Sequence, residues 1–334
     1  MSDRTQASKQ SETQPQSARA AAPTQAHWLR RQQRLGWLYV APAMAFFLLM
    51  IAYPIGRSLY LSFFDYSILE PDSARFVGMG NYGKLVTQEQ NRLPFGNTLY
   101  FTAIFVPAYV IGALLIAIGL NAVRRGSVFL RTMIFIPIVV SLAVSAVMWT
   151  LFYNPSFGLA QRILEVLASI VNWFPRLFER GPWLVVPAAG MLADKSWAMI
   201  AIAILCLWNG IGLNCILFLV GLQRIPDELY EAAHVDGAGG WRRFWDITLP
   251  QLRPTIYLVT LLSLIGAFKI FGQPYIMTMG GPQDATLTYV MRLYNLAFKY
   301  GRFELGYASA LAYALAVFTL VVSLGMRRLN RSVE

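Results

Sequence analysis

Charged residues are scarce in this sequence. Asp, Glu, Lys and Arg make up 13% of its 334 residues, whereas a soluble domain carries about a quarter. More than half of the residues, 56%, are hydrophobic, and they come in long blocks without the periodicity of half-buried helices or strands. This composition excludes an ordinary soluble domain and favours a protein embedded in a membrane.

Cysteine and histidine are also rare. The two cysteines, Cys206 and Cys215, lie in one predicted helix, which holds them farther apart than a disulfide can span. We therefore expect both to be packing residues. The two histidines, His27 and His234, lie far apart in the chain, so a metal site and histidine-based catalysis gain no support.

The sequence lacks a phosphate-binding loop for ATP. Its Lys195-Ser196 pair could end a G-x-x-x-x-G-K-[ST] pattern, but it follows Asp194 instead of glycine. We therefore expect that the chain is not an enzyme, has no catalytic residue and binds no cofactor of its own.

Six long stretches contain no Asp, Glu, Lys or Arg, or a single one. They are Leu35–Gly56, Leu93–Val123, Thr132–Gln161, Trp197–Gln223, Pro254–Met279 and Leu305–Met326. Each reaches the roughly 20 residues that a helix needs to cross the hydrocarbon of a bilayer. The sequence therefore predicts an all-α membrane protein with six transmembrane helices.

Two shorter apolar segments lie between the third and fourth stretches. Arg162–Val171 is predicted to form a short helix on the membrane surface. Pro182–Leu192 is too short to span and is interrupted by Pro187, so it is either interfacial or re-entrant.

The formal net charge of +11 could suggest nucleic acid as a partner. Lys and Arg crowd near the helix ends that face the cytoplasm when both termini are cytoplasmic, which favours that topology and contact with membrane lipid instead. We expect a disordered cytoplasmic tail at 1–34, a transmembrane domain at 35–328 with an inner loop at 224–253, and a cytoplasmic tail at 329–334.

The inner loop contains a short predicted helix. Pro226 suits its first position, Asp227 and Glu228 suit the positive end of its dipole, and Gly237 suits its end. One face collects four residues at spacings of three and four, namely Leu229, Ala232, Ala233 and Asp236. Such a helix either approaches another surface closely or simply covers the bundle, and the residues alone leave both readings open.

The same loop carries a spaced motif. Glu231-Ala232-Ala233, then Gly237, then Ile247-x-Leu249-Pro250 resemble the complete EAA loop of the permease subunits of ABC importers. A resemblance to the carbohydrate-type permeases, such as those for maltose and glycerol phosphate, covers about residues 36–328. Its marks are Gly78-x-Gly80-Asn81-Tyr82, Arg131-Thr132, Ile136-Pro137, Trp149, Gly221-Leu222, Ile225-Pro226, Asp236-Gly237-Ala238, Thr278-x-Gly280-Gly281-Pro282 and Gly306-Tyr307-Ala308-x-Ala310.

The resemblance implies a coupling helix seated in a cleft of a cytoplasmic ATPase. The residues it assigns to this contact are Glu231, Ala232, Ala233, Asp236, Gly237, Leu249 and Pro250. ATP and Mg would be bound by the ATPase and not by this chain. The implied partners are a second permease subunit with its own EAA loop, two ATPases and an extracytoplasmic solute-binding protein. The implied location is the inner membrane of a prokaryote.

The resemblance also implies a substrate path along the two helices that flank the inner loop. Its residues are Trp208, Asn209, Gly210, Leu213, Ser263, Ala267, Lys269 and Ile270. Asn209, Asn214 and Ser263 could instead bond neighbouring helices. Lys269 is a charged residue inside a predicted span, and such residues are often functional. Many family members carry an acidic residue where this chain has Gly272. Lys269 therefore lacks this acidic residue as a partner.

The expected function is import of a sugar, oligosaccharide or polyol by alternating access, driven by ATP hydrolysis in another subunit. The same kind of importer for glycerol phosphate or another small solute is the nearest alternative. An ion-coupled secondary transporter and a membrane scaffold without transport are the alternatives from other classes.

Overall fold

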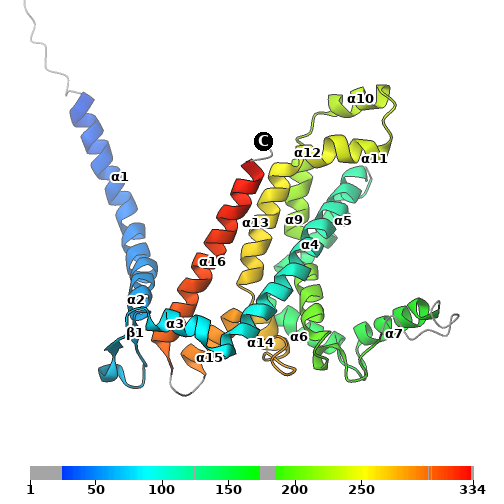
Figure 1. Ribbon diagram of the computed structural model, residues 1–334. Coiled ribbons are helices and arrows are strands. Elements are labelled where there is room, and N and C mark those ends of the chain that lie inside the picture. The colour runs from blue at the N-terminus through cyan, green and yellow to red at the C-terminus, as the bar shows by residue number, and fades with distance from the viewer. Residues whose placement is uncertain (1–24, 124, 174–184, 300, 302, 332–334) are drawn as a thin grey trace, which may run out of the picture. The chain divides into compact units, whose positions relative to one another are not determined.

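The computed structural model describes residues 25–123, 125–173, 185–299, 301 and 303–331 (Figure 1). The chain divides into two compact units, residues 1–57 and 58–334, which are described separately. The first unit contains α1 (Gln25–Phe47), the π-helical turn η1 (Leu48–Ala52) and the start of α2 (Tyr53–Leu61). Helix therefore begins inside the segment expected to be a tail, and residues 1–24 lie outside the described part.

The second unit is a bundle of helices with one small hairpin. Its helices are α3 (Gly80–Thr87), α4 (Arg92–Ala122), α5 (Ser127–Val139), α6 (Leu142–Phe152), α7 (Leu159–Val171), α9 (Ala198–Leu222), α10 (Asp227–Val235), α11 (Gly240–Arg243), α12 (Leu249–Gln251), α13 (Arg253–Phe268), α14 (Gly272–Met277), α15 (Tyr289–Phe298) and α16 (Leu305–Arg331). Shorter turns are η2 (Pro71–Ser73), η3 (Glu89–Asn91), η4 (Met191–Ala193) and the π-helical η5 (Phe244–Thr248). Strands β1 (Phe64–Asp65) and β2 (Arg75–Phe76) pair antiparallel, Phe64 opposite Phe76.

Four helical segments among the described residues are long and apolar enough to cross a membrane. They are Gly36–Leu61, Glu89–Ala122, Ala198–Leu222 and Leu305–Arg328. Two bent pairs, Ser127–Val139 with Leu142–Phe152 and Gly240–Gln251 with Arg253–Phe268, raise the number to six if each is one span. The prediction of a helical membrane protein is confirmed, with four to six candidate spans.

The third predicted span is not one straight helix. α5 and α6 meet at 99°, and α6 ends at Phe152, well before the predicted end at Gln161. Pro137 weakens the end of α5, and the extended Ser141 starts α6 because its hydroxyl accepts a hydrogen bond from the Val144 N–H at 3.4 Å.

The fifth predicted span, Pro254–Met279, is also broken. α13 ends at Phe268 and α14 begins at Gly272. Pro274 has no N–H for the Ile270 carbonyl one turn earlier, and the Thr288 hydroxyl donates to that carbonyl instead at 2.9 Å. The loop before α15 thus stabilises the break.

The segment between α6 and α9 agrees in part with expectation. The predicted short helix exists as α7 and begins at Leu159, three residues earlier than expected. Its exposed apolar side chains include Ile163, Val166 and Ile170. Of Pro182–Leu192, residues 182–184 lie outside the described part, and the rest is irregular until η4 begins at Met191.

The core of the second unit lies where α4 and α9 pack along their lengths, with α5 and α13 against them. Small residues such as Ala113 and Ala117 on α4 and Ala201 on α9 are fully buried, which lets the helices approach closely. Gly212 of α9 lies directly against the α5 backbone, because a Cβ there would be 2.5 Å from the Ile134 carbonyl oxygen.

The Gly-x-Gly-Asn-Tyr motif is structural. Asn81 is fully buried and its amide donates to the carbonyls of Ser62 (2.9 Å) and Phe64 (2.8 Å), which fixes the chain entering β1. Gly306 leaves room for the same strand, because a Cβ there would overlap the Phe64 carbonyl oxygen. These two motifs therefore hold α16 against β1.

Candidate functional site

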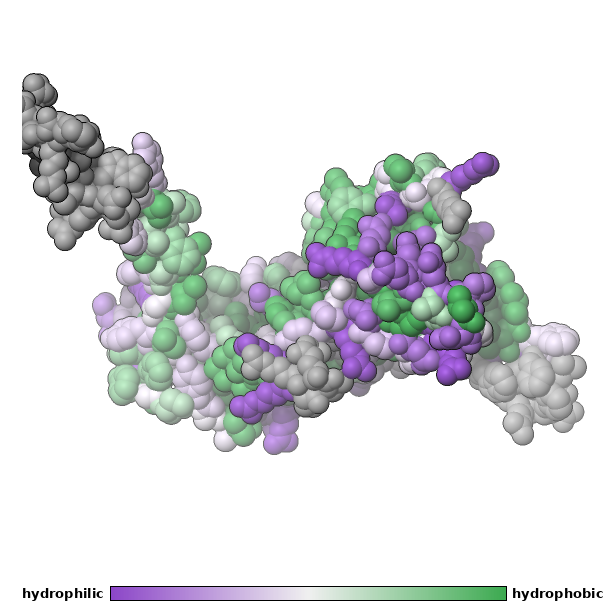
Figure 2. All heavy atoms as spheres, turned by 90° about the horizontal axis from the view of Figure 1, so that it is seen from above, coloured by the Kyte–Doolittle hydropathy of each residue, from purple (hydrophilic) through white to green (hydrophobic). Residues whose placement is uncertain are grey.

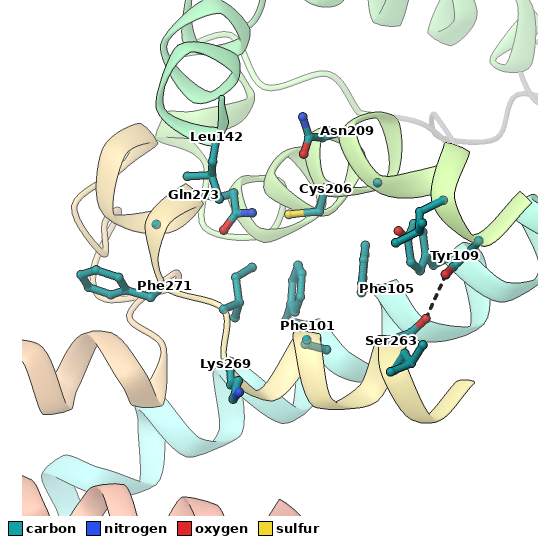
Figure 3. Close-up of a pocket in the computed structure, with 18 residues that line it drawn as sticks. Phe101, Phe105, Tyr109, Leu142, Cys206, Asn209, Ser263, Lys269, Phe271 and Gln273 are labelled. Carbon is teal, nitrogen blue, oxygen red and sulfur yellow. Dashed lines mark hydrogen bonds between the residues drawn. The ribbon is translucent and has the colours of Figure 1, made fainter. Parts of the chain in front are cut away.

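A cavity of about 640 Å³ opens in the second unit between α4, α9 and the broken α13–α14 pair (Figure 3). Eighteen residues line it. They are Phe101, Phe105, Tyr109, Leu142, Cys206, Asn209, Gly210, Leu213, Asn214, Leu262, Ser263, Gly266, Ala267, Lys269, Ile270, Phe271, Gly272 and Gln273. All of the predicted substrate-path residues except Trp208 are among them. The structure thus brings α9 and α13, the two helices that flank the inner loop, together around one cavity.

Trp208 lies elsewhere. Its half-buried ring packs against Trp149 of α6, with 5.7 Å between the ring centroids. It supports the junction between α6 and α9, so the aromatic surface expected from Trp208 is not part of the cavity.

Aromatic residues of α4 supply the aromatic wall instead. Phe101, Phe105 and Tyr109 follow one another at four-residue intervals and stack, with ring centroids 5.0 and 4.8 Å apart. Since their faces contact each other, they offer mainly ring edges to the cavity, as Figure 3 shows for the two phenylalanines. Tyr109 also explains Gly210, because a Cβ there would overlap the tyrosine hydroxyl.

The expected polar residues are engaged in bonds between helices. The Asn209 amide donates to the Pro137 carbonyl at 2.9 Å and to the Ser145 hydroxyl at 3.3 Å, which ties α9 to the α5–α6 break. The Asn214 amide donates to the Ser263 hydroxyl at 3.2 Å, which ties α9 to α13. The alternative that these residues bond neighbouring helices is therefore confirmed, although all three also line the cavity.

Gln273 is a cavity residue that the sequence reasoning missed. It lies in the first turn of α14, and its amide turns toward the cavity across from Cys206 (Figure 3). Among the described residues its amide forms no side-chain hydrogen bond, so both its donor and its acceptor are free for a ligand. Cys206, expected to be a packing residue, is half-buried and turns its sulfur toward the same space.

Lys269 is the one charged residue among those that line the cavity. It follows α13 at the break, and its side chain is exposed. It takes part in neither of the two ion pairs found in the described part of the chain. Gly272, the position at which many family members carry an acidic residue, lies nearby. It packs against Leu142, because a Cβ added to Gly272 would be 2.8 Å from the Leu142 Cδ2.

The short helix predicted in the inner loop is present as α10, beyond the ends of α9 and α13 (Figure 1, top). Pro226 is its N-cap with extended backbone and not its first helical residue, so the helix begins one residue later than expected. Asp227 and Glu228 occupy the first turn as predicted. Seen from this end, hydrophilic side chains gather over α10 and α11 (Figure 2).

Gly237 ends α10 in the predicted way. Its φ of +74° is the left-handed conformation that glycine adopts without strain, and its N–H donates to the His234 carbonyl at 3.0 Å. The Ala238 N–H donates to the Ala233 carbonyl at 2.8 Å, which completes a Schellman motif. No atom would lie within 4 Å of an added Cβ, so within this chain backbone conformation alone demands the glycine.

The assigned coupling residues fall into two groups. Glu231, Ala232 and Asp236 are exposed on and just after α10, and Ala233 is half-buried beside them. Leu249 and Pro250 lie apart from these in α12, half-buried where the loop returns to the bundle.

Tyr230 joins these groups, and the sequence reasoning did not single it out. Its hydroxyl shares a hydrogen bond of 2.9 Å with the hydroxyl of buried Thr248, at the end of η5. α10 itself contains no buried residue. This contact therefore anchors α10 to the segment that leads into α13.

Comparisons with known proteins identify the family. Residues 94–334 match the family described as binding-protein-dependent transport system inner membrane component. The chain is 34% identical over 290 residues to the probable ABC transporter permease protein YurN of Bacillus subtilis (strain 168), which covers 86% of this chain and 93% of that protein. It is 34% identical over 291 residues to the lactose transport system permease protein LacF of Rhizobium radiobacter, and the match covers 86% of this chain and 91% of that protein.

A solved structure has the same fold. It is the crystal structure of a bacterial alginate ABC transporter in complex with a periplasmic protein that holds an alginate pentasaccharide. One of its chains superposes with a TM-score of 0.71 at 21% identity, covering 91% of this chain and 96% of that chain. The chain described here belongs to the family of binding-protein-dependent transport system inner membrane components.

Proposed function

We propose that this chain is a transmembrane subunit of an ATP-binding-cassette importer that moves a sugar, oligosaccharide or polyol across the inner membrane. The observation that carries the proposal is the cavity between α9 and α13, because the loop joining these two helices contains α10. A push on α10 would therefore act directly on the walls of the cavity. The names of the lactose and alginate transport relatives support a carbohydrate as solute.

The proposed mechanism is alternating access. α10 would sit in a cleft of a cytoplasmic ATPase, which binds ATP and Mg, and closure of two ATPases would rock two permease subunits as rigid bodies. This requires six crossings, with both termini and α10 in the cytoplasm. The two bent helix pairs are compatible with six crossings.

The proposed assembly contains a second permease subunit with its own EAA loop, two ATPases and an extracytoplasmic solute-binding protein. The family description and the periplasmic protein bound to the alginate transporter support the last of these. A cavity that a single subunit does not fully enclose fits a path completed by another subunit.

Two experiments test the proposal. The tagged chain, expressed with its neighbouring genes, should co-purify with a nucleotide-binding subunit, and in proteoliposomes with its binding protein it should take up sugar when ATP is present. Uptake driven by an ion gradient without ATP would establish a secondary transporter instead. If glycerol phosphate and not sugar stimulated ATP hydrolysis, the carbohydrate assignment would be wrong while the importer assignment stood.

Gln273 provides a prediction about solute binding. Replacing it with methionine, of similar length, removes both hydrogen-bonding groups that face the cavity. The solute concentration for half-maximal ATPase stimulation should rise about tenfold, since a polar group of the solute that loses its partner in the cavity weakens binding by roughly 1–2 kcal/mol. Gln223→Met, at the exposed end of α9, should leave this concentration unchanged. An equal response of both variants would remove Gln273 from the site.

A further inference from the structure

A second cavity, of about 500 Å³, lies behind α10 at the end of the bundle. Nine residues line it: Ile118, Asn121, Ala122, Leu222, Tyr230, Gly240, Arg243, Phe244 and Thr248. They come from the ends of α4 and α9 and from both arms of the inner loop. The cavity is separate from the one between α9 and α13, with which it shares no lining residue.

Arg243 is the only charged residue among the nine. Its guanidinium Nε is buried and has no hydrogen-bond partner in the described part of the chain. A buried charged donor without a partner is costly, because water is removed and nothing replaces it. The neighbouring Arg242 differs, since it is exposed and its Nε lies 3.3 Å from the Asp246 carboxylate. Arg243 is half-buried and, unlike Arg242, has no acidic partner among the described residues, so its guanidinium is available to an anion.

Apart from Arg243 and Asn121, the lining of the cavity is mainly apolar. Ile118, Leu222 and Phe244 contribute hydrocarbon surface, and Tyr230 and Thr248 already bond to each other. A free inorganic anion would satisfy Arg243 but would leave this surface against water. A ligand with a negative group and a hydrocarbon part matches both features.

The surroundings of Arg243 resemble a membrane interface. Trp241 and Trp245 are exposed, and with Phe244 they form an aromatic cluster with ring centroids 5.4 to 6.2 Å apart. Exposed tryptophans beside basic residues are typical of helix ends at the level of lipid headgroups. Basic pockets between helix ends are where lipid headgroups bind.

We infer that this cavity binds an anionic phospholipid, with the phosphate on Arg243 and part of an acyl chain against Ile118, Leu222 and Phe244. Because Tyr230 forms one wall, the lipid would contact the anchor of the coupling helix. The lipid composition of the membrane would then affect how firmly α10 is held. This inference does not depend on the identity of the solute.

The test is lipid retention. The full-length chain, purified with its partner subunits, is incorporated into nanodiscs of phosphatidylcholine with phosphatidylglycerol, extracted gently, and its bound lipids are counted by native mass spectrometry. We expect retained phosphatidylglycerol, lowered about tenfold in Arg243→Gln by loss of a charge-assisted hydrogen bond. Arg242→Gln removes the same charge from the adjacent residue and should retain as much as the wild type. Arg243→Lys should retain most of it.

Three results would overturn the inference. The first is equal retention by Arg243→Gln and Arg242→Gln. The second is an Arg243-dependent rise in the melting temperature with inorganic phosphate alone, which would identify a soluble anion as the ligand. The third is loss of the nucleotide-binding subunit from Arg243→Gln with lipid retention unchanged, which would assign the cavity to a protein contact. Equal melting temperatures of all variants in phosphatidylcholine alone would show that the substitutions leave the fold intact.

Discussion

Replacing Tyr230 with alanine is expected to separate ATP hydrolysis from transport. α10 has no buried residue, and Tyr230 holds it to buried Thr248 through a 2.9 Å hydrogen bond. Without the ring and the hydroxyl, a force on α10 would reach η5, α12 and α13 only through the backbone that connects them. Solute uptake in proteoliposomes should fall at least about tenfold, since the lost bond and buried area are worth roughly 2–3 kcal/mol. ATP hydrolysis by the same preparation should continue.

Two further variants give this prediction its controls. Tyr230→Phe keeps the ring and loses only the hydroxyl, so its uptake should lie between those of the wild type and the alanine variant. His234→Ala changes an exposed residue of the same helix and should transport normally. If uptake and hydrolysis fell in parallel in Tyr230→Ala, the residue would be needed for ATPase docking and not for transmission.

The helices could be predicted from the sequence much better than the breaks between them. Long apolar stretches located α4, α9 and α16 to within a few residues, because a span must be apolar along its whole length. The breaks near Pro137 and Pro274 were missed. Proline alone does not mark a break, since Pro107 lies inside the continuous α4.

What distinguishes the broken helices is contact with distant residues. Thr288 satisfies the carbonyl that Pro274 leaves free, and Ser141 provides a new N-cap after α5. The Thr288 contact joins residues 18 positions apart in the chain, which periodicity and composition do not reveal. For the same reason Gln273, in the short helix after the second break, was not expected in the cavity.

The cavity could be predicted in part. The resemblance placed on it residues of α9, of α13 and of the break after α13, and all but Trp208 lie there. The aromatic row of Phe101, Phe105 and Tyr109 was missed because α4 is apolar on every side, so its sequence does not indicate which face meets α9. The roles of the coupling residues remain predictions, because they concern a contact with another protein.

Replacing Gly212 with valine is expected to lower stability strongly. A Cβ at this position would lie 2.5 Å from the Ile134 carbonyl oxygen and 3.2 Å from the Phe135 Cα. Both are backbone atoms of α5, so no side chain can turn away, and α5 itself must move. Overpacking of this kind costs about 1–3 kcal/mol or more. The protein should unfold at a markedly lower temperature in detergent and accumulate poorly in the membrane.

The same displacement should reach the cavity between α9 and α13. Asn209, one turn before Gly212 on α9, donates its hydrogen bond to the Pro137 carbonyl at the end of α5, so moving α5 would break this bond as well. Gly119→Val is the matched control, because an added Cβ in that α4 position has no atom within 4 Å. Equal melting temperatures of the two valine variants would mean that α5 does not lie against α9 as closely as described. A lower melting temperature of Gly212→Val alone would support the close contact between α9 and the α5 backbone.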